Sequence, residues 1–151
     1  MAPSKALALF KRNLVVHESA LAKGKGWSPL TWQILEGKNR IPITLIEASE
    51  QVDSGVIYLQ RRLNLRGDEL VDELKAKQSQ ATVFLCKYFV RSYPKILSKA
   101  RQQKGRTTCY KRRQKKDNQI NASKSLKDVF TLMRVADNYC YPLFININKI
   151  R

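Results

Sequence analysis

The sequence is poor in the residues that build metal centres and disulfide frameworks. Among its 151 residues there are one histidine and three cysteines, and no cysteines stand in a Cys-x-x-Cys spacing. A single histidine and three distant cysteines do not match the ligand spacings of a zinc site. The odd number of cysteines indicates reduced thiols rather than disulfide bonds. We therefore predict no metal site and a cytoplasmic protein.

Long apolar runs are also missing. No stretch approaches the roughly 18 consecutive apolar residues that cross a membrane, and residues 1–10 lack the apolar core and cleavage site of a signal peptide. Hydrophobic residues nevertheless make up 43% of the chain, which is enough for a folded core. The sequence thus predicts one folded domain, or the major part of one, with no membrane partner.

Acidic residues are scarce, and the scarcity is local. The chain has 29 Lys and Arg against 12 Asp and Glu, a net charge of +17; residues 1–90 carry 13 and 9 of them, and residues 91–151 carry 16 and 3. From Arg91 to Lys116 there are eleven basic residues and no acidic one. Such a block is typically a solvated segment, but it can also bind phosphates non-specifically. Nucleic-acid binding through residues 91–116 therefore stays open.

Hydrophobic periodicity predicts an α/β protein. Short apolar or alternating runs favour strands at residues 13–17, 41–48, 56–63 and 139–150. Helical spacing and capping residues favour one helix from Ser28 to Glu36 and a long one from Gly67 to Tyr93. A short helix follows up to Ala100, and a last one runs from Ser123 or Ser125 to Arg134. Residues 101–121 are polar and basic, and we expect a loop or an extended arm there.

Residues that could take part in catalysis or binding lie at the end of the first predicted strand and after it. His17 ends that strand, and ligands of α/β sheets bind at the carboxyl ends of strands. It can serve as a general acid or base, or it can be a hydrogen-bonded structural residue. Lys23-Gly24-Lys25-Gly26 can bring backbone N–H groups and positive charge to an anion. Asp53 lies in a turn, where Asp is common for conformational reasons, yet with His17 it can form a proton-handling pair.

Taken together, these residues resemble the signature of the formyltransferase family, which includes methionyl-tRNA formyltransferase and sugar N-formyltransferases. The family pattern is His-x-Ser-x-Leu-Pro, a basic glycine-containing loop, a helix, and an Asp-x-Gly turn about 36 positions after the histidine. Here His17, Ser19 and Leu21 precede the loop Lys23–Gly26, and Asp53-Ser54-Gly55 begins 36 positions after His17. The likeness covers residues 12–93 and continues more weakly through 124–142. The form of the loop is more similar to the amino-sugar branch of the family.

The resemblance implies transfer of a formyl group from 10-formyltetrahydrofolate to a primary amine. The acceptor would carry phosphate, as an amino-sugar nucleotide or an aminoacyl-tRNA does. His17 would stabilise the oxyanion that forms when the amine attacks, and Asp53 would orient or charge His17 and help to remove the amine proton. Ser19 and the loop residues Lys23, Gly24, Lys25 and Gly26 would shape the acceptor side.

The resemblance also implies a fold. The chain would be the C-terminal part of a Rossmann-like formyltransferase domain, with an incomplete mixed sheet flanked by helices. Residues 1–100 would be a partial catalytic domain, residues 101–122 a basic linker or arm, and residues 123–151 an extension made of a helix and a strand. The strands that precede the histidine in the family would be missing. We therefore expect an exposed sheet edge that calls for a homodimer partner or for the missing N-terminal half.

Two positions depart from the family pattern. Val15 stands where the family has Asn, and an apolar side chain cannot donate a hydrogen bond to the oxyanion. The loss of one such donor costs on the order of 100-fold or more in rate. Ala22 stands where the family has Pro, which should loosen the loop. A basic nucleic-acid-binding module and an inactive pseudoenzyme, each on a degenerate formyltransferase core, are the alternative interpretations.

Overall fold

A three-stranded antiparallel sheet forms the centre of the computed structural model, which describes residues 4–146. The strand order is β1 (Leu14–His17), β3 (Arg40–Glu47), β4 (Ile57–Asn64). All three strands were predicted, because each combines short apolar stretches with two-residue alternation. The register between β1 and β3 pairs His17 with Thr44, which brings the last residue of β1 to the middle of β3.

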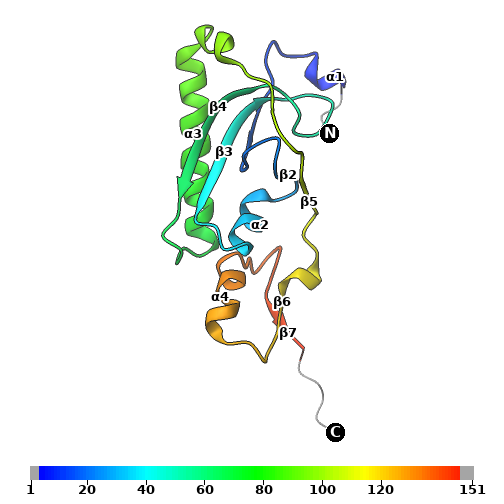
Figure 1. Cartoon of the computed structure of the whole chain (residues 1–151), viewed down its shortest axis with the longest axis vertical. Helices are drawn as coiled ribbons and strands as arrows, with labels where there is room; N and C mark the ends of the chain where they lie inside the picture. Colours follow the sequence, from blue (N-terminus) through cyan, green and yellow to red (C-terminus); the bar gives the residue numbers. More distant parts are fainter. Residues whose placement is uncertain (1–3, 147–151) are drawn as a thin grey trace.

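One face of the sheet is covered by helix α3 (Val71–Ser92) (Figure 1). Ile41, Ile43 and Leu45 alternate along β3, and all three are completely buried in the main core. Helix α2 (Pro29–Leu35) packs into the same core. Full burial of one such side chain stabilises the fold by about 1.5–3 kcal/mol. The core therefore fixes β3 and, through its pairing with β1, the position of His17.

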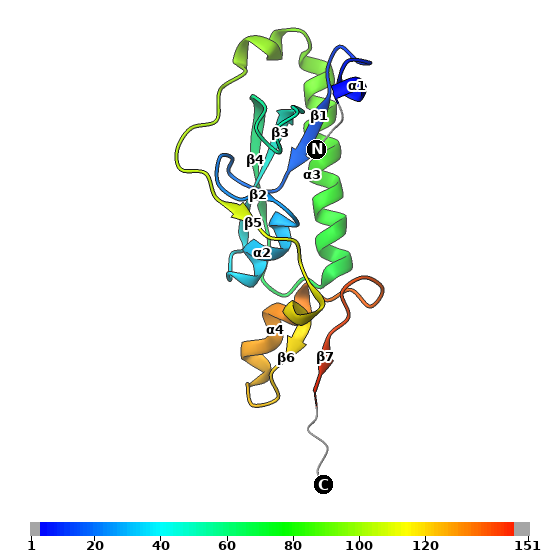
Figure 2. The same ribbon diagram turned by 90° about the vertical axis from the view of Figure 1, so that its right-hand side faces the viewer.

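The other face of the sheet is covered by irregular chain. Leu21, Ile46 and Ile57 form a small second core there. After the short helix η1 (Lys95–Lys99), the chain pairs with the start of β4 and then runs down the side of the molecule opposite α3 (Figure 2). Residues 103–110 of this segment are called the strap below. The strap ends in β5 (Cys109–Tyr110), which pairs in parallel with β2 (Lys25–Gly26).

The segment after the strap forms a separate lobe at the lower end of Figure 1. It comprises η2 (Lys115–Asn118), β6 (Gln119–Ile120), α4 (Leu126–Arg134) and β7 (Phe144–Ile145). The hydroxyl of Ser125 accepts a hydrogen bond from the backbone N–H of Asp128 at 3.2 Å, so Ser125 rather than Ser123 caps α4. The strand predicted over residues 139–150 is limited to β7 within the described residues, and positions 147–150 lie outside them.

Two helix starts differ in detail from the prediction. Helix α3 begins at Val71 rather than near Gly67, because the Glu69 carboxylate accepts the backbone N–H groups of Arg66 and Gly67 and fixes a turn there. Ser28 occupies the cap position of α2, as predicted, but its side chain makes no capping hydrogen bond. Gly37, which follows the last residues of α2, has a φ of 79°, a left-handed conformation that commonly ends a helix.

The outer edge of β1 pairs with no strand among the described residues, as expected from the sequence. Val15 on this edge is 37% exposed, and Leu9 and Phe10, which follow helix α1 (Ser4–Leu7), are 74% and 68% exposed. Between residues 4 and 146, no helix has the length and apolar character needed to cross a membrane.

Candidate active site

His17 lies at the end of β1 and is 5% exposed. Its Nε2 lies 2.8 Å from the carbonyl oxygen of Gly24, and its Nδ1 lies 3.6 Å from a carboxylate oxygen of Asp53. Both neighbours are acceptors, and a neutral imidazole carries only one N–H. The ring is therefore held between two acceptors, and an N–H on Nε2 can be donated to the Gly24 carbonyl.

Asp53 approaches His17 from the turn between β3 and β4. The turn is tightly folded, because Asp53 itself has a φ of 48° and a Cβ added at Gly55 would collide with the carbonyl oxygen of Glu47. The second oxygen of the Asp53 carboxylate accepts the backbone N–H of Gly26 at 2.8 Å. The Asp-x-Gly pattern thus has a local cause: glycine lets the turn lie close to β3, and this places the carboxylate beside the ring.

The glycine-containing loop connects the two candidate catalytic residues. The Gly24 carbonyl contacts His17 and the Gly26 N–H contacts Asp53. Lys25 donates to the hydroxyl of Ser54 at 2.6 Å, which ties the loop to the Asp53 turn a second time. A Cβ at Gly26, whose φ is 92°, would lie 2.5 Å from the carbonyl oxygen of Tyr110, so only glycine fits this close approach.

Ser19 follows His17 and lies beneath the loop. Its carbonyl accepts the hydroxyl of Thr44 at 2.6 Å, and Gln60 donates to the same hydroxyl at 3.0 Å. The Ser19 hydroxyl is buried and has no hydrogen-bond partner among the described residues. Sequence reasoning did not identify Thr44 or Gln60. Thr44 is a polar residue within the apolar stretch of β3, whereas Gln60 stands beside Arg61 and Arg62 and carries no comparable signal.

A cleft of about 520 Å³ opens beside Ser19 and Gly24. Three of its lining residues are cations: Lys23 from the glycine-containing loop, and Lys38 and Arg40 from the connection of α2 to β3 and the start of that strand. Lys38 forms an ion pair with Glu36, whereas Lys23 and Arg40 pair with no carboxylate within residues 4–146. The cleft therefore combines positive charge with the unpartnered Ser19 hydroxyl, which suits an anionic group.

Tyr110 contributes a neutral wall to this cleft. Burial and a hydrogen bond from its hydroxyl to Glu36, at 3.0 Å, raise the pKa of Tyr110 to about 12. Its ring stacks on that of Trp32, with the ring centroids 6.4 Å apart.

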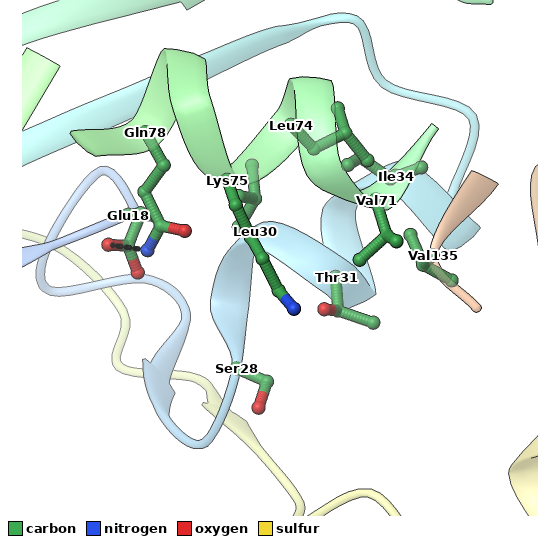
Figure 3. A pocket seen from close by; sticks show the side chains of 10 residues that line it. All are labelled: Glu18, Ser28, Leu30, Thr31, Ile34, Val71, Leu74, Lys75, Gln78 and Val135. Atoms are coloured by element: carbon green, nitrogen blue, oxygen red, sulfur yellow. Dashed lines mark hydrogen bonds between the residues drawn. The ribbon is translucent and has the colours of Figure 1, made fainter. Parts of the chain in front are cut away.

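A second cleft, of about 170 Å³, lies between α2 and α3 (Figure 3). At one end Gln78 donates to the carboxylate of Glu18 at 2.7 Å, and Leu30, Ile34 and Leu74 provide apolar walls. Neither His17 nor Asp53 lines either cleft, but Gly24 of the first cleft hydrogen-bonds to His17, whereas no lining residue of the second hydrogen-bonds to either side chain. The second cleft is therefore separate from the pair of residues that could carry out chemistry.

The structure brings nearly all predicted site residues into one connected region. His17 and Asp53 face each other, and the loop residues Gly24, Lys25 and Gly26 contact them or their turn. Ser19 and Lys23 instead line the adjoining cleft. Two strap residues that sequence reasoning missed, Gln103 and Thr108, hydrogen-bond to the Asp53 turn and to Gly24. In the described part of the chain, His, Cys, Asp and Glu form no group that could hold a metal ion.

Comparison with known proteins finds formyltransferases among those similar to this chain. No family model matches the chain. The methionyl-tRNA formyltransferase of Mycoplasma capricolum is 27% identical over 134 residues, which cover 87% of this chain and 42% of that protein. The chain thus spans about two fifths of the length of the curated relatives that it matches over most of its own sequence.

Solved structures agree with the sequence relatives. Methionyl-tRNA formyltransferase from Clostridium thermocellum superposes with a TM-score of 0.75 and 25% identity, over 99% of this chain and 63% of that one. A sugar 3N-formyl transferase, determined in the presence of dTDP and 5-N-formyl-THF, shares the fold with a TM-score of 0.68 and 20% identity, over 87% and 49% of the two chains. The α/β arrangement and the resemblance stated from the sequence are confirmed.

Proposed function

We propose that this chain carries the His–Asp part of an active site that transfers a formyl group from 10-formyltetrahydrofolate to a primary amine. The observation that carries the proposal is the buried His17 ring, held between the Gly24 carbonyl and the Asp53 carboxylate. This arrangement stands in a chain whose sequence relatives are methionyl-tRNA formyltransferases. A sugar formyltransferase of the same fold was determined with a formylated folate, which supports a folate-type donor.

The residues present suit the formyl end of such a donor. When bound, the donor supplies the one-carbon unit. His17 donates an N–H to the oxygen on which negative charge develops. Asp53 orients the ring, accepts the proton that the attacking amine loses and returns it to the departing tetrahydrofolate. Because the Gly24 carbonyl occupies Nε2 here, the loop must release that nitrogen before His17 can serve a substrate. Val15 offers no hydrogen bond, so stabilisation of the oxyanion rests on His17.

The basic cleft supports an acceptor that carries phosphate. Lys23 and Arg40 supply positive charge, and the buried hydroxyl of Ser19 supplies an unused hydrogen-bonding group. The cleft reaches the catalytic pair through Gly24, which lines the cleft and contacts His17. An aminoacyl-tRNA and an amino-sugar nucleotide both present a primary amine near phosphate, and both are acceptors for the test.

The test is formyl transfer with defined donor and acceptors. The purified chain is incubated with 10-formyltetrahydrofolate and either methionyl-tRNA or a dTDP-linked amino sugar, and the formylated product is detected by mass spectrometry. Because the relatives are longer, each reaction is repeated with the N-terminal half of the Mycoplasma capricolum relative added as a separate polypeptide. We expect product in at least one arm and its loss in His17→Asn. Absence of product from every arm, or product that His17→Asn leaves unchanged, would refute the proposal.

A second candidate function is nucleic-acid binding through residues 91–116. One observation favours it: the guanidinium of Arg112 lies 5.2 Å from the centre of the Trp27 ring, which is 57% exposed. Exposed aromatic rings beside arginine suit stacked bases. Filter binding of single-stranded RNA across a salt series tests it. Affinity that falls steeply with salt and weakens in Arg112→Ala would support this function, and no binding at low salt would exclude it.

A further inference from the structure

We infer that the strap, residues 103–110, is the positioning element of the His17–Asp53 site, with Gln103 holding the Asp53 turn and Thr108 holding the Gly24 loop. Its meaning for catalysis rests on the proposed formyl transfer. The contacts themselves do not depend on that function. They explain why a polar, basic segment, which the sequence suggests to be a loop or arm, lies ordered against both halves of the site.

Gln103 holds the turn that carries Asp53. Its amide donates to the carbonyl oxygens of Asp53 at 2.7 Å and of Gly55 at 2.9 Å, on either side of the bend. Just ahead of the strap, Arg101 and Ile57 exchange two backbone hydrogen bonds at 2.8 and 2.9 Å, which anchor the segment to β4. Because Asp53 has a positive φ, its conformation is disfavoured for a residue with a side chain, and these hydrogen bonds help to stabilise it.

Thr108 holds the opposite side of the site. Its hydroxyl accepts the backbone N–H of Gly24 at 2.9 Å, and its carbonyl accepts the backbone N–H of Lys25 at 2.9 Å. Gly24 is therefore bonded through its N–H to the strap and through its carbonyl to His17. The position of Thr108 consequently fixes where the Gly24 carbonyl meets the imidazole ring.

One short segment thus sets both acceptors that face His17. Gln103 acts on the Asp53 side and Thr108 on the Gly24 side, and neither contacts the ring itself. Because both residues belong to the strap, a displacement of the strap moves both the Asp53 turn and the Gly24 loop. On the Asp53 side the strap holds the carboxylate beside the ring, and on the Gly24 side it controls the contact that must open before Nε2 can meet a substrate. Gln103 and Thr108 are therefore positioning residues.

The histidine provides its own reporter. His17 is the only histidine in the chain, so the imidazole ¹⁵N and ¹H signals in an NMR spectrum belong to it without assignment. The test variants are Thr108→Val, which removes the hydroxyl acceptor, and Gln103→Glu, which removes the amide donor with little change of shape. Thr107→Val and Gln102→Glu make the same changes at the neighbouring exposed positions and serve as controls.

We expect both test variants to shift the His17 ring signals and both controls to leave them unchanged. Exchange of the Gly24 amide should become about 2–10-fold faster in Thr108→Val, the effect of losing one ordinary hydrogen bond. Thr108→Ser keeps the hydroxyl and should restore both readings. Denaturant midpoints measured in parallel should differ between each test variant and its control by no more than the loss of one or two hydrogen bonds explains, which separates a local effect from general loss of stability.

Unchanged ring signals in both test variants would overturn the inference, as would equal shifts in the controls. If either variant does not fold, the other tests the same strap from the opposite side of His17. An activity measurement distinguishes failure of the proposed formyl transfer from failure of the positioning role. Responsive ring signals in a chain without formyl transfer would remove the proposed function and leave the positioning role. Active protein with unresponsive ring signals would remove the positioning role alone.

Discussion

The molecule contains two buried pairs that each join a basic and an acidic side chain, and the surroundings of the two pairs differ. His17 and Asp53 face each other at 3.6 Å, and Glu69 and Arg134 face each other at 3.4 Å. Among the described residues, the Asp53 carboxylate receives one hydrogen bond, from a backbone N–H. The Glu69 carboxylate is surrounded by donors from the backbone of Arg66 and Gly67 and from the side chains of Lys77 and Arg134.

The contrast separates a structural pair from a candidate catalytic one. Burial alone raises the pKa of Glu69, but the hydrogen bonds from Lys77 and from backbone N–H groups outweigh it and lower the pKa to about 2. Glu69 is thus fixed as an anion and joins the α4 lobe to the main core. Asp53 keeps unused acceptor capacity and a side chain that is 14% exposed. A buried charge pair by itself does not mark an active site, and what distinguishes Asp53 from Glu69 is the smaller number of hydrogen bonds that its carboxylate accepts.

The largest expected effect is on the structural pair. Glu69→Ala leaves the guanidinium of Arg134 buried without its carboxylate, and breaking such a pair costs about 3–5 kcal/mol. Urea unfolding followed by circular dichroism measures the loss. Asp68→Ala is the matched control, because Asp68 lies in the same turn and its ion pair with Arg66 is exposed. We expect no resolvable change of its midpoint. Equal midpoints for the two variants would contradict the assigned difference in burial.

The candidate catalytic pair should respond in the opposite way. Asp53→Asn keeps the shape of the side chain but loses its charge and its ability to accept a proton. We expect kcat for formyl transfer to fall by about 100-fold or more, with a denaturant midpoint close to that of the unmodified chain. A kcat close to that of the unmodified chain would show that Asp53 belongs to the turn and not to the chemistry.

Acid should weaken the structural pair selectively. The pKa of Glu69 is lower in the folded chain than its ordinary value of 4.5, so the carboxylate stabilises the fold above that pH, and the stabilisation is lost as the pH falls from about 5 towards 2. Denaturant midpoints measured over this range should fall, and Glu69→Gln should flatten the decline. A decline of the same steepness in Glu69→Gln would assign the acid sensitivity to other carboxylates.

The smallest expected effect is a gain at the site. Val15 lies two residues before His17 on β1, so both side chains project to the same face of the strand. The formyltransferase pattern has Asn at this position, and Val15→Asn would add an amide donor beside the ring. We expect formyl transfer to rise by about tenfold or more, and Val15→Thr, which adds only a hydroxyl, serves as the control. An unchanged rate would mean that His17 alone binds the oxyanion.

The sequence predicted the proximity of His17 and Asp53 better than that of Glu69 and Arg134. His17 and Asp53 were found because each belongs to a short local pattern and the two patterns stand at a characteristic separation. Glu69 and Arg134 are 65 residues apart, and neither lies in a pattern that marks a partner. Long-range pairing of this kind depends on how α4 packs, which local periodicity does not encode.

The strap shows the same limit. Gln103 reaches back 50 positions to Asp53, and Thr108 reaches back 84 positions to Gly24. Both lie in a basic, polar stretch without hydrophobic periodicity, which predicts only a solvated segment. The strands β1, β3 and β4 were predictable because burial of alternating apolar residues places them. The strap is placed by hydrogen bonds to turns and loops, and these leave no periodic signal.

The most direct test of the His17–Asp53 assignment is a single-turnover formyl-transfer measurement. The unmodified chain and Asp53→Asn are compared at saturating 10-formyltetrahydrofolate and acceptor, each with the N-terminal half of the Mycoplasma capricolum relative added. We predict formylated product from the unmodified chain and a rate at least about 100-fold lower for Asp53→Asn. Equal rates for the two chains, or no product from either, would contradict the assignment.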